Sequence, residues 1–176
     1  MSRRRLFALS IGWGILLAVA YGIVHDQITA RICIEYFTVW HPPLVTEPDP
    51  TLVGLVWGVV ATWWVGAILG ALLAFAATAG ARIPATLGQV RRSMAILLVV
   101  SGTCAALTGL IVAKSGFVAP SFIAGPEITA LGMEKLRAFS ICLAVHNVSY
   151  NVAFVGALVA AFLLFRSRPK PTVPPV

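Results

Sequence analysis

The sequence predicts an all-α membrane protein: a four-transmembrane-helix bundle with a small ordered extracytoplasmic cap. Three observations support this prediction. Of the 176 residues, 59% are hydrophobic and only 11% are charged, whereas a soluble globular domain carries about 25% charged residues. Four apolar runs reach the roughly 20 residues that a helix needs to cross a bilayer. The basic and acidic side chains are sorted to opposite sides of these runs.

Each apolar run is expected to form one helix, because lipid offers no hydrogen bonds to an open backbone. The expected helices cover residues 6–25, 52–79, 93–114 and 136–165, within a single transmembrane domain over residues 1–165. Residues 166–176 are rich in proline. This composition predicts a flexible cytoplasmic tail.

The first run also has features of a signal peptide. Three arginines precede it, and residues 18–20 read Ala-Val-Ala, which resembles a cleavage site. Apolar residues continue past this point, and His25 and Asp26 follow directly. We therefore expect an uncleaved first helix. Cleavage would leave three helices in the same orientation.

Small residues recur every four positions in the second run and, more briefly, in the third. Such a stripe lets the backbones of two helices approach closely. The glycines expected to serve helix packing are Gly54, Gly58, Gly66, Gly70 and Gly109. Packing within one chain is the main interpretation, and a homo-oligomer interface is the alternative.

The loop after the first run has a strand-like composition. Thr29–Trp40 is rich in β-branched and aromatic residues, and its polar and apolar side chains alternate. This pattern favours an extended segment along the membrane surface. Pairing with residues 115–122 would give a short β-hairpin within the cap, although Pro120 limits the ladder.

The charge distribution predicts that both termini are cytoplasmic. Nine basic residues and no acidic residue fall on the side of the termini, whereas the other side holds four basic residues and all six acids. Positive charge is retained in the cytoplasm. The net charge of +7 is thus a topology signal, so we expect a lipid bilayer as partner and no nucleic acid.

Polar residues gather on the extracytoplasmic side, which holds all three histidines. The candidate polar site consists of His25, Asp26, Arg31, Glu35, His41, His146, Asn147, Tyr150 and Asn151. His146 lies inside the fourth run, and its helical neighbours make a polar arc there. Polar side chains in a membrane normally face the bundle interior or a wet cavity.

Three interpretations of these residues remain open. The first is a structural or accessory membrane protein, alone or in a larger membrane complex. The second is a metal-binding protein or metal-dependent membrane enzyme that holds a divalent transition metal through His25, Glu35, His41 and His146. The third is a transporter of small molecules or ions. The spacing matches no HExxH or CxxC motif, and no hydrolase motif such as GxSxG is present, so the sequence favours a non-enzymatic role.

The segment "HDQITARICIEYFTVWHPP", followed by "PTLVGLVWGVVATWWVGAILG", resembles a group of bacterial multi-pass membrane proteins. The likeness covers about Tyr21 to Gly70. It carries no activity, and therefore no functional residue is transferred. It implies a bacterial inner membrane, in agreement with the predicted topology.

Overall fold

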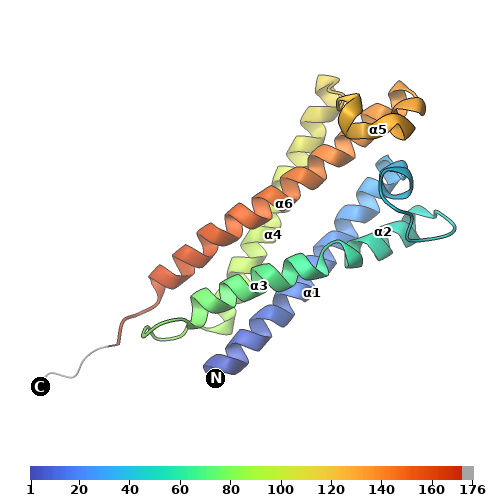
Figure 1. Cartoon of the computed structure of the whole chain (residues 1–176). Coiled ribbons are helices and arrows are strands. Elements are labelled where there is room, and N and C mark those ends of the chain that lie inside the picture. Colours follow the sequence, from blue (N-terminus) through green and yellow to red (C-terminus); the bar gives the residue numbers. More distant parts are fainter. Residues whose placement is uncertain (172–176) are drawn as a thin grey trace, which may run out of the picture.

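A computed structural model describes residues 1–171, and all regular structure in this range is helical, without a strand (Figure 1). The elements are α1 (Arg3–Ile32), the π-helix η1 (Tyr36–Trp40), α2 (Pro50–Val60), α3 (Trp63–Thr78), α4 (Leu87–Ser115), α5 (Ser121–Ala130) and α6 (Met133–Ser167). Four segments are long and apolar enough to cross a membrane: α1, the α2–α3 unit, α4 and α6. The prediction of an all-helical protein with four membrane-spanning segments is therefore confirmed in its coarse form.

Short polar side chains fix where the helices begin. The Ser2 hydroxyl caps α1, and the Asp49 carboxylate accepts two backbone N–H groups at the start of α2. Thr86 and Gln89 form a reciprocal capping box on α4. These caps satisfy N–H groups that have no partner within the helix. The helix α4 ends at Gly116, whose φ of 70° is a left-handed conformation that glycine adopts without strain.

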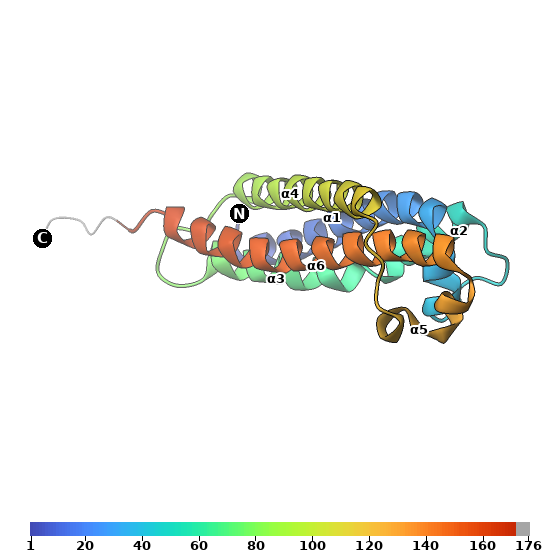
Figure 2. The same ribbon diagram turned by 90° about the horizontal axis from the view of Figure 1, so that it is seen from above.

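The helices form two pairs. α1 packs mainly against α2 and α3, and α4 packs against α6. Contacts of α3 with α6 and of α1 with α4 join the pairs into a bundle (Figure 2). The beginning of α1 and the end of α6 lie at the same end of the bundle (Figure 1), here called the terminal end. The opposite end, where η1 and α5 lie, is called the far end.

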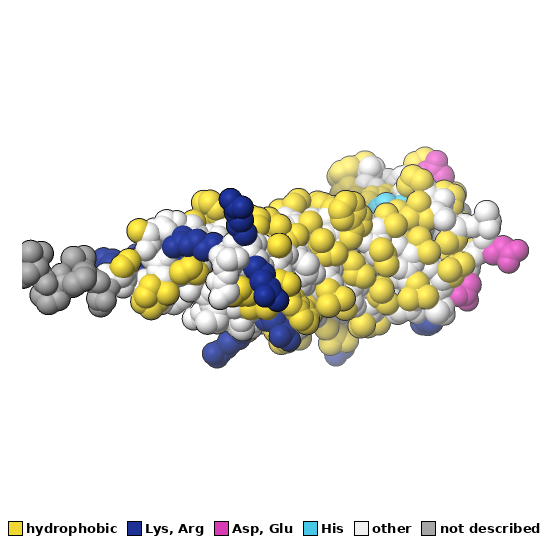
Figure 3. All heavy atoms as spheres, turned by 90° about the horizontal axis from the view of Figure 1, so that it is seen from below, with side chains coloured by type: hydrophobic (Ala, Val, Ile, Leu, Met, Phe, Trp, Pro, Cys, Tyr) yellow, Lys and Arg dark blue, Asp and Glu magenta, His cyan; other side chains and the backbone are white. Residues whose placement is uncertain are grey.

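The surface of the bundle shows the same sorting of charge as the sequence. In Figure 3, Lys and Arg side chains gather toward the terminal end, Asp and Glu side chains lie at the far end, and hydrophobic side chains cover the middle. This apolar belt is the surface expected of a protein that lipid surrounds.

Packing at the terminal end includes part of the predicted tail. Arg168 is only 2% exposed, and its guanidinium donates to the carbonyl groups of Ala76, Arg82 and Ile83. The predicted flexible segment 166–176 therefore does not begin at residue 166, because α6 continues to Ser167 and Arg168 is fixed against the α3–α4 connection. Residues 172–176 lie outside the described residues.

The glycine stripe of the second run lies against α1. A Cβ atom added to Gly58 would lie 2.5 Å from the Cα of Ile23, and one added to Gly70 would lie 2.9 Å from the Cα of Ile11. Gly54 and Gly66 make similar backbone approaches to α1. Gly109 instead packs on Val145 of α6. All five predicted glycines thus serve packing within the chain.

The second run is not one continuous helix. It breaks at Ala61–Thr62, between α2 and α3. The Thr62 hydroxyl donates to the carbonyl of Gly58 at 2.5 Å, and the Tyr150 hydroxyl donates to the carbonyl of Ala61 at 3.3 Å. Side-chain donors therefore satisfy carbonyl groups next to the break, as a membrane interior requires. The other spans extend past their predicted ends: α1 reaches Ile32, and α6 begins at Met133.

The predicted β-hairpin is wrong. Residues 29–32 complete α1, residues 36–40 form η1, and residues 121–130 form α5. The separate ordered cap is not supported either. Cys33, Tyr36 and Phe37 are buried with Val53 and Phe139 in the core of the bundle, so their aromatic character reflects packing against helices.

Candidate functional site

Three chemically active side chains meet inside the bundle near its far end. His25 and Asp26 lie on α1, and His146 lies on α6. Each offers one ligand atom, and these atoms all lie within 4.8 Å of one another. Asp26 is 3% exposed and His146 is 9% exposed. A cluster of ionisable groups buried in a membrane-spanning bundle is costly, which favours a functional role.

Two hydrogen bonds orient the His146 ring. Its Nδ1 lies 2.7 Å from the carbonyl oxygen of Cys142, which can only accept, so Nδ1 carries a proton. Its Nε2 lies 3.1 Å from Oδ1 of Asp26. In a neutral imidazole with a protonated Nδ1, the Nε2 atom holds a lone pair. Two electron-pair donors, Nε2 and the carboxylate, therefore face each other, and this arrangement needs a proton or another cation.

His25 completes the cluster. Its ring contacts the ring of His146 edge to face, with centroids 4.6 Å apart, and stacks on Tyr21 one helical turn earlier. In the described part of the chain, the Nε2 of His25 is the buried side-chain nitrogen or oxygen without a hydrogen-bond partner. A buried polar atom left unpaired costs about 1–3 kcal/mol. A ligand at this atom would remove that cost.

The three side chains have the composition of a transition-metal site. Two imidazole nitrogens and one carboxylate oxygen suit zinc or non-haem iron, and three protein ligands leave coordination positions open. The bond from His146 Nδ1 to a backbone carbonyl matches the usual second interaction of a metal-bound histidine.

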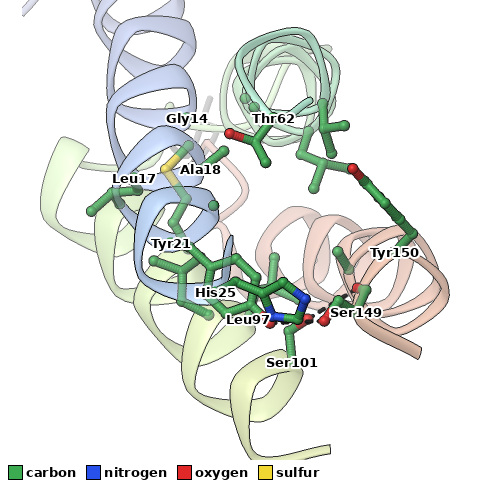
Figure 4. A pocket seen from close by; sticks show the side chains of 18 of the residues that line it. Gly14, Leu17, Ala18, Tyr21, His25, Thr62, Leu97, Ser101, Ser149 and Tyr150 are labelled. Carbon is green, nitrogen blue, oxygen red and sulfur yellow. Dashed lines mark hydrogen bonds between the residues drawn. The ribbon is translucent and has the colours of Figure 1, made fainter. Parts of the chain in front are cut away.

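A cavity adjoins the cluster between α1, α3, α4 and α6 (Figure 4). Its volume is about 90 Å³. Its polar lining residues are Tyr21, His25, Asp26, Thr62, Ser101, His146, Ser149 and Tyr150. The Tyr21 hydroxyl bonds the Ser149 hydroxyl at 2.9 Å, and the Ser101 hydroxyl donates to the Ser149 carbonyl at 3.0 Å. These hydrogen bonds hold the polar wall in place.

Aromatic rings cover the cluster on its far-end side. Tyr36 of η1 stacks on His146 with centroids 4.5 Å apart and planes 22° apart. Phe37 meets the same ring edge to face. Both residues are buried. The extra residue per turn of a π-helix re-aims side chains and is often found at functional sites, and here it sets Tyr36 over the histidine.

Two of the four predicted metal ligands lie elsewhere. Glu35 pairs with Lys135 at 2.5 Å. Burial raises the pKa of Glu35, but the hydrogen bond and charge of Lys135 outweigh burial, and the net pKa is lowered. The Nδ1 of His41 donates to the Tyr36 carbonyl at 2.8 Å, and its ring packs on Trp57. The proposed set of His25, Glu35, His41 and His146 therefore does not converge. His25 and His146 do lie close together, and the third member of their cluster is Asp26, not Glu35 or His41.

The remaining predicted polar residues divide between the cavity and the surface. Tyr150 lines the cavity. Asn147 and Asn151 are exposed and donate to carbonyl groups one turn earlier on their own helix, so the polar arc does not point wholly inward. Arg31 bonds Gln27 and the Thr51 hydroxyl, which ties the end of α1 to α2.

Sequence reasoning missed Tyr21, Tyr36, Ser101 and Ser149. Helical spacing gives a signal for two of them, because Tyr21 lies four residues before His25 and Ser149 lies three residues after His146, and such pairs share a face. Ser101 lies on a different helix from the histidines, and no spacing in the sequence relates it to them. Tyr36 had no usable signal, because its segment was read as a strand. Cys33 lies nearby, but burial raises the pKa of its thiol to about 11, which disfavours a thiolate ligand.

No protein-family model, curated protein or solved structure matches the chain.

Proposed function

We propose that this chain is a multi-pass membrane protein that binds one divalent transition-metal ion through His25, Asp26 and His146. The convergence of these three ligand atoms inside the bundle is the observation that supports the proposal. We further propose a bacterial inner membrane with both termini cytoplasmic, since the basic residues gather at the terminal end. The metal site then lies in the half of the bundle nearer the extracytoplasmic surface.

The distance between His146 and Asp26 fits ligands of a shared ion. Metal–nitrogen and metal–oxygen bonds of about 2.0–2.2 Å at ordinary coordination angles put two ligand atoms about 3.0–3.5 Å apart. The observed separation of Nε2 and Oδ1 is 3.1 Å. A ligand atom of His25 lies within 4.8 Å of those of Asp26 and His146, and the Nε2 of His25 has no hydrogen-bond partner to give up. The open position would face the cavity, where a water molecule or a substrate fits.

A structural or accessory role is the second candidate, and the direct Asp26–His146 contact favours it. In that case a proton replaces the metal, and the hydrogen bond ties α1 to α6. Interhelical hydrogen bonds in membranes contribute about 0.6–2 kcal/mol. A transport pathway has less support. Only the part of the cavity toward the far end has polar lining residues, and the part toward the terminal end is lined by apolar residues.

Metal analysis of the purified protein tests the proposal. The protein is purified in detergent, stripped with a chelator, and reloaded with zinc, iron(II), manganese or copper in separate samples. We expect about one ion per chain with at least one metal. His146→Ala and His25→Ala should each lower the affinity at least tenfold, because each removes a ligand.

His41→Ala is the matched control, since His41 lies close by but bonds Tyr36 and packs on Trp57. This variant should bind metal as the parent does. Absence of stoichiometric metal from the parent protein, or equal binding by the parent and His146→Ala, would favour the structural role instead.

A further inference from the structure

A groove lies on the outer surface between α4 and α6, toward the terminal end of the bundle. Its volume is about 520 Å³, within the roughly 300–1,000 Å³ that is typical of ligand sites. Leu97 is the one residue that this groove shares with the cavity beside the metal cluster. The groove is therefore a separate feature, which the proposed metal binding does not use.

The lining of the groove changes from polar to apolar along the bundle axis. On each helix the lining residues recur at three- and four-residue spacing and so share one face. The polar ones lie nearest the terminal end: Gln89, Arg92 and Ser93 on α4 and Ser167 on α6. The apolar ones follow toward the middle of the bundle: Ile96, Leu97 and Val100 on α4 and Leu164, Leu163, Ala160, Val159 and Gly156 on α6. A molecule that fills the groove must have the same polarity along its length.

The apolar part of the groove is narrow and open to lipid. A Cβ atom added to Gly156 would lie 2.7 Å from a methyl carbon of Leu97, so the absence of a side chain on Gly156 lets Leu97 lie low between the helices. Val100 and Val159 on the two sides are exposed. On α6 the lining extends from Ser167 to Gly156, which is about 16 Å at the rise of a helix. These dimensions suit one extended acyl chain.

Arg92 places a positive charge without a carboxylate partner at the polar end of the groove. The ion pairs of the described residues involve Glu35 and Asp26, and no acidic residue falls on the side of the termini. The neighbouring Arg91 does not line the groove, and its guanidinium lies over the ring of Trp13, 4.1 Å from the centroid. A guanidinium that has no carboxylate partner is well suited to bind phosphate, because its N–H groups match two phosphate oxygens.

Gln89 offers a second hydrogen-bond donor beside Arg92. Its side-chain oxygen accepts from the backbone N–H of Thr86 at 2.8 Å, in the capping box of α4. The amide N–H₂ group of the same side chain is left to donate. Gln89 and Arg92 are three residues apart and share a helix face, so both can donate to one anion at the end of the groove.

We propose that the groove binds one anionic phospholipid, with its phosphate at Arg92 and Gln89 and one acyl chain between Val100 and Val159. Basic pockets between transmembrane helices are known sites for anionic lipid headgroups. The lipid comes from the leaflet at the terminal end, which is the anionic cytoplasmic leaflet under the proposed orientation. This inference goes beyond the proposed metal binding and does not depend on it.

A second copy of the chain fits the groove less well than a phospholipid. A parallel copy in the same membrane would place its own terminal end at the same depth. That end carries nine basic residues and no acidic one, so it offers no anion to Arg92. Like charges at such close range repel each other.

Native mass spectrometry of the detergent-purified protein tests the inference. Phosphatidylglycerol and phosphatidylcholine with the same two acyl chains are added in separate samples at equal concentration. We expect one phosphatidylglycerol per chain, bound about fivefold or more tightly than phosphatidylcholine, because one basic residue near the membrane surface contributes about this factor. Equal binding of the two lipids would overturn the inference.

Arg92→Gln should weaken phosphatidylglycerol binding about fivefold. Arg91→Gln is the matched control, since it makes the same change of charge one residue away and outside the groove. It should leave the binding within about twofold of the parent, because Arg91 lies over Trp13. Both arginines are exposed, so neither substitution removes a buried contact. Equal losses in the two variants would mean a general attraction to positive charge and would overturn the inference.

Ala160→Phe should fill the apolar part of the groove and weaken binding by a similar factor. Leu158→Phe, on an exposed part of the same helix, is its control and should bind as the parent does. If Ala160→Phe does not fold, Val100→Trp with the control Val99→Trp repeats the test from α4. Unchanged binding in the blocking variant would overturn the inference.

Two further outcomes identify other occupants. Glycerol 3-phosphate has the phosphate without the acyl chains, and displacement of the lipid by an equal concentration of it would show that the groove binds a free phosphate ester. A dimer that Ala160→Phe abolishes would show that a second copy occupies the groove. Either result would overturn the inference. Metal content is measured on the same samples and should not change in any groove variant, so the lipid inference and the proposed function can fail independently.

Discussion

Substitutions of Asp26 can show whether its carboxylate binds a metal or only forms a hydrogen bond with His146. His146 donates from Nδ1 to the Cys142 carbonyl, which leaves a lone pair on Nε2 next to Asp26. An asparagine at position 26 keeps the size of the side chain and can donate an N–H to that lone pair. It lacks the charge of the carboxylate and is a poor metal ligand. An alanine offers neither interaction.

We therefore expect Asp26→Asn to lose the metal but to keep its free energy of unfolding in the metal-free state close to that of the parent. Asp26→Ala should lose the metal and also lose about 1–3 kcal/mol, because His146 Nε2 stays buried without a partner. Metal titration and thermal unfolding of the chelator-treated proteins measure the two effects. Undiminished metal affinity in Asp26→Asn would exclude the carboxylate as a ligand.

The sequence marked His25 and His146 because both are polar residues at the ends or interior of apolar runs, and the structure brings them together. It marked Glu35 and His41 on residue type alone. Lys135, exposed on the neighbouring helix, pairs with Glu35, and no pattern in the sequence reveals that pairing. Asp26 belonged to the candidate polar site but not to the predicted set of metal ligands. Its carboxylate meets His146 because α6 packs against α1.

At the scale of helices, the close approach of α1 to α3 holds the site in register. Gly14 and Gly12 lie two residues apart on α1 but in different surroundings. A Cβ atom at Gly14 would lie 2.8 Å from the Cα of Gly70, whereas nothing lies within 4 Å of one at Gly12. The first substitution requires the two backbones to separate, and the second does not.

Gly14→Ala should therefore lower the free energy of unfolding by about 1–3 kcal/mol, as overpacking does. Gly12→Ala should be neutral or stabilising by up to about 1 kcal/mol, because alanine favours the helix. Unfolding temperatures in one detergent provide the measurement. Equal effects of the two substitutions would refute the close packing of α1 on α3.

The four spans were predictable because length and hydropathy alone decide them. The break at Ala61–Thr62 was not, since its carbonyl groups find their donors in Thr62 and in Tyr150 from a distant helix. The π-helix was missed for a related reason. Its aromatic residues favour a strand by propensity, but burial against α6 and α2 decides their conformation, and propensity is only a weak guide where packing is strong.

At the scale of the whole molecule, the site exists only because the two helix pairs associate. His25 and His146 are 121 positions apart in the chain, and the α3–α6 and α1–α4 contacts bring them together. The order of the helices around a bundle, and the rotation of each helix about its own axis, follow from side-chain packing. No pattern in a single sequence predicts that packing. The sorting of charge, by contrast, was readable from the sequence, and the proposed orientation of the site rests on it through the positive-inside rule.

Cysteine labelling tests that orientation without changing any charge. Thr46→Cys lies in the exposed η1–α2 connection, and Ala81→Cys lies in the exposed α3–α4 connection. In a background without the three native cysteines, a membrane-impermeant maleimide applied to intact cells should label Thr46→Cys at once. It should label Ala81→Cys only after lysis, because the positive-inside rule places that connection in the cytoplasm. The reverse pattern would place His25 and His146 nearer the cytoplasmic surface, so that the metal would have to be supplied from the cytoplasm. Labelling of both cysteines in intact cells would contradict a four-span membrane protein, and the apolar belt would then need another partner.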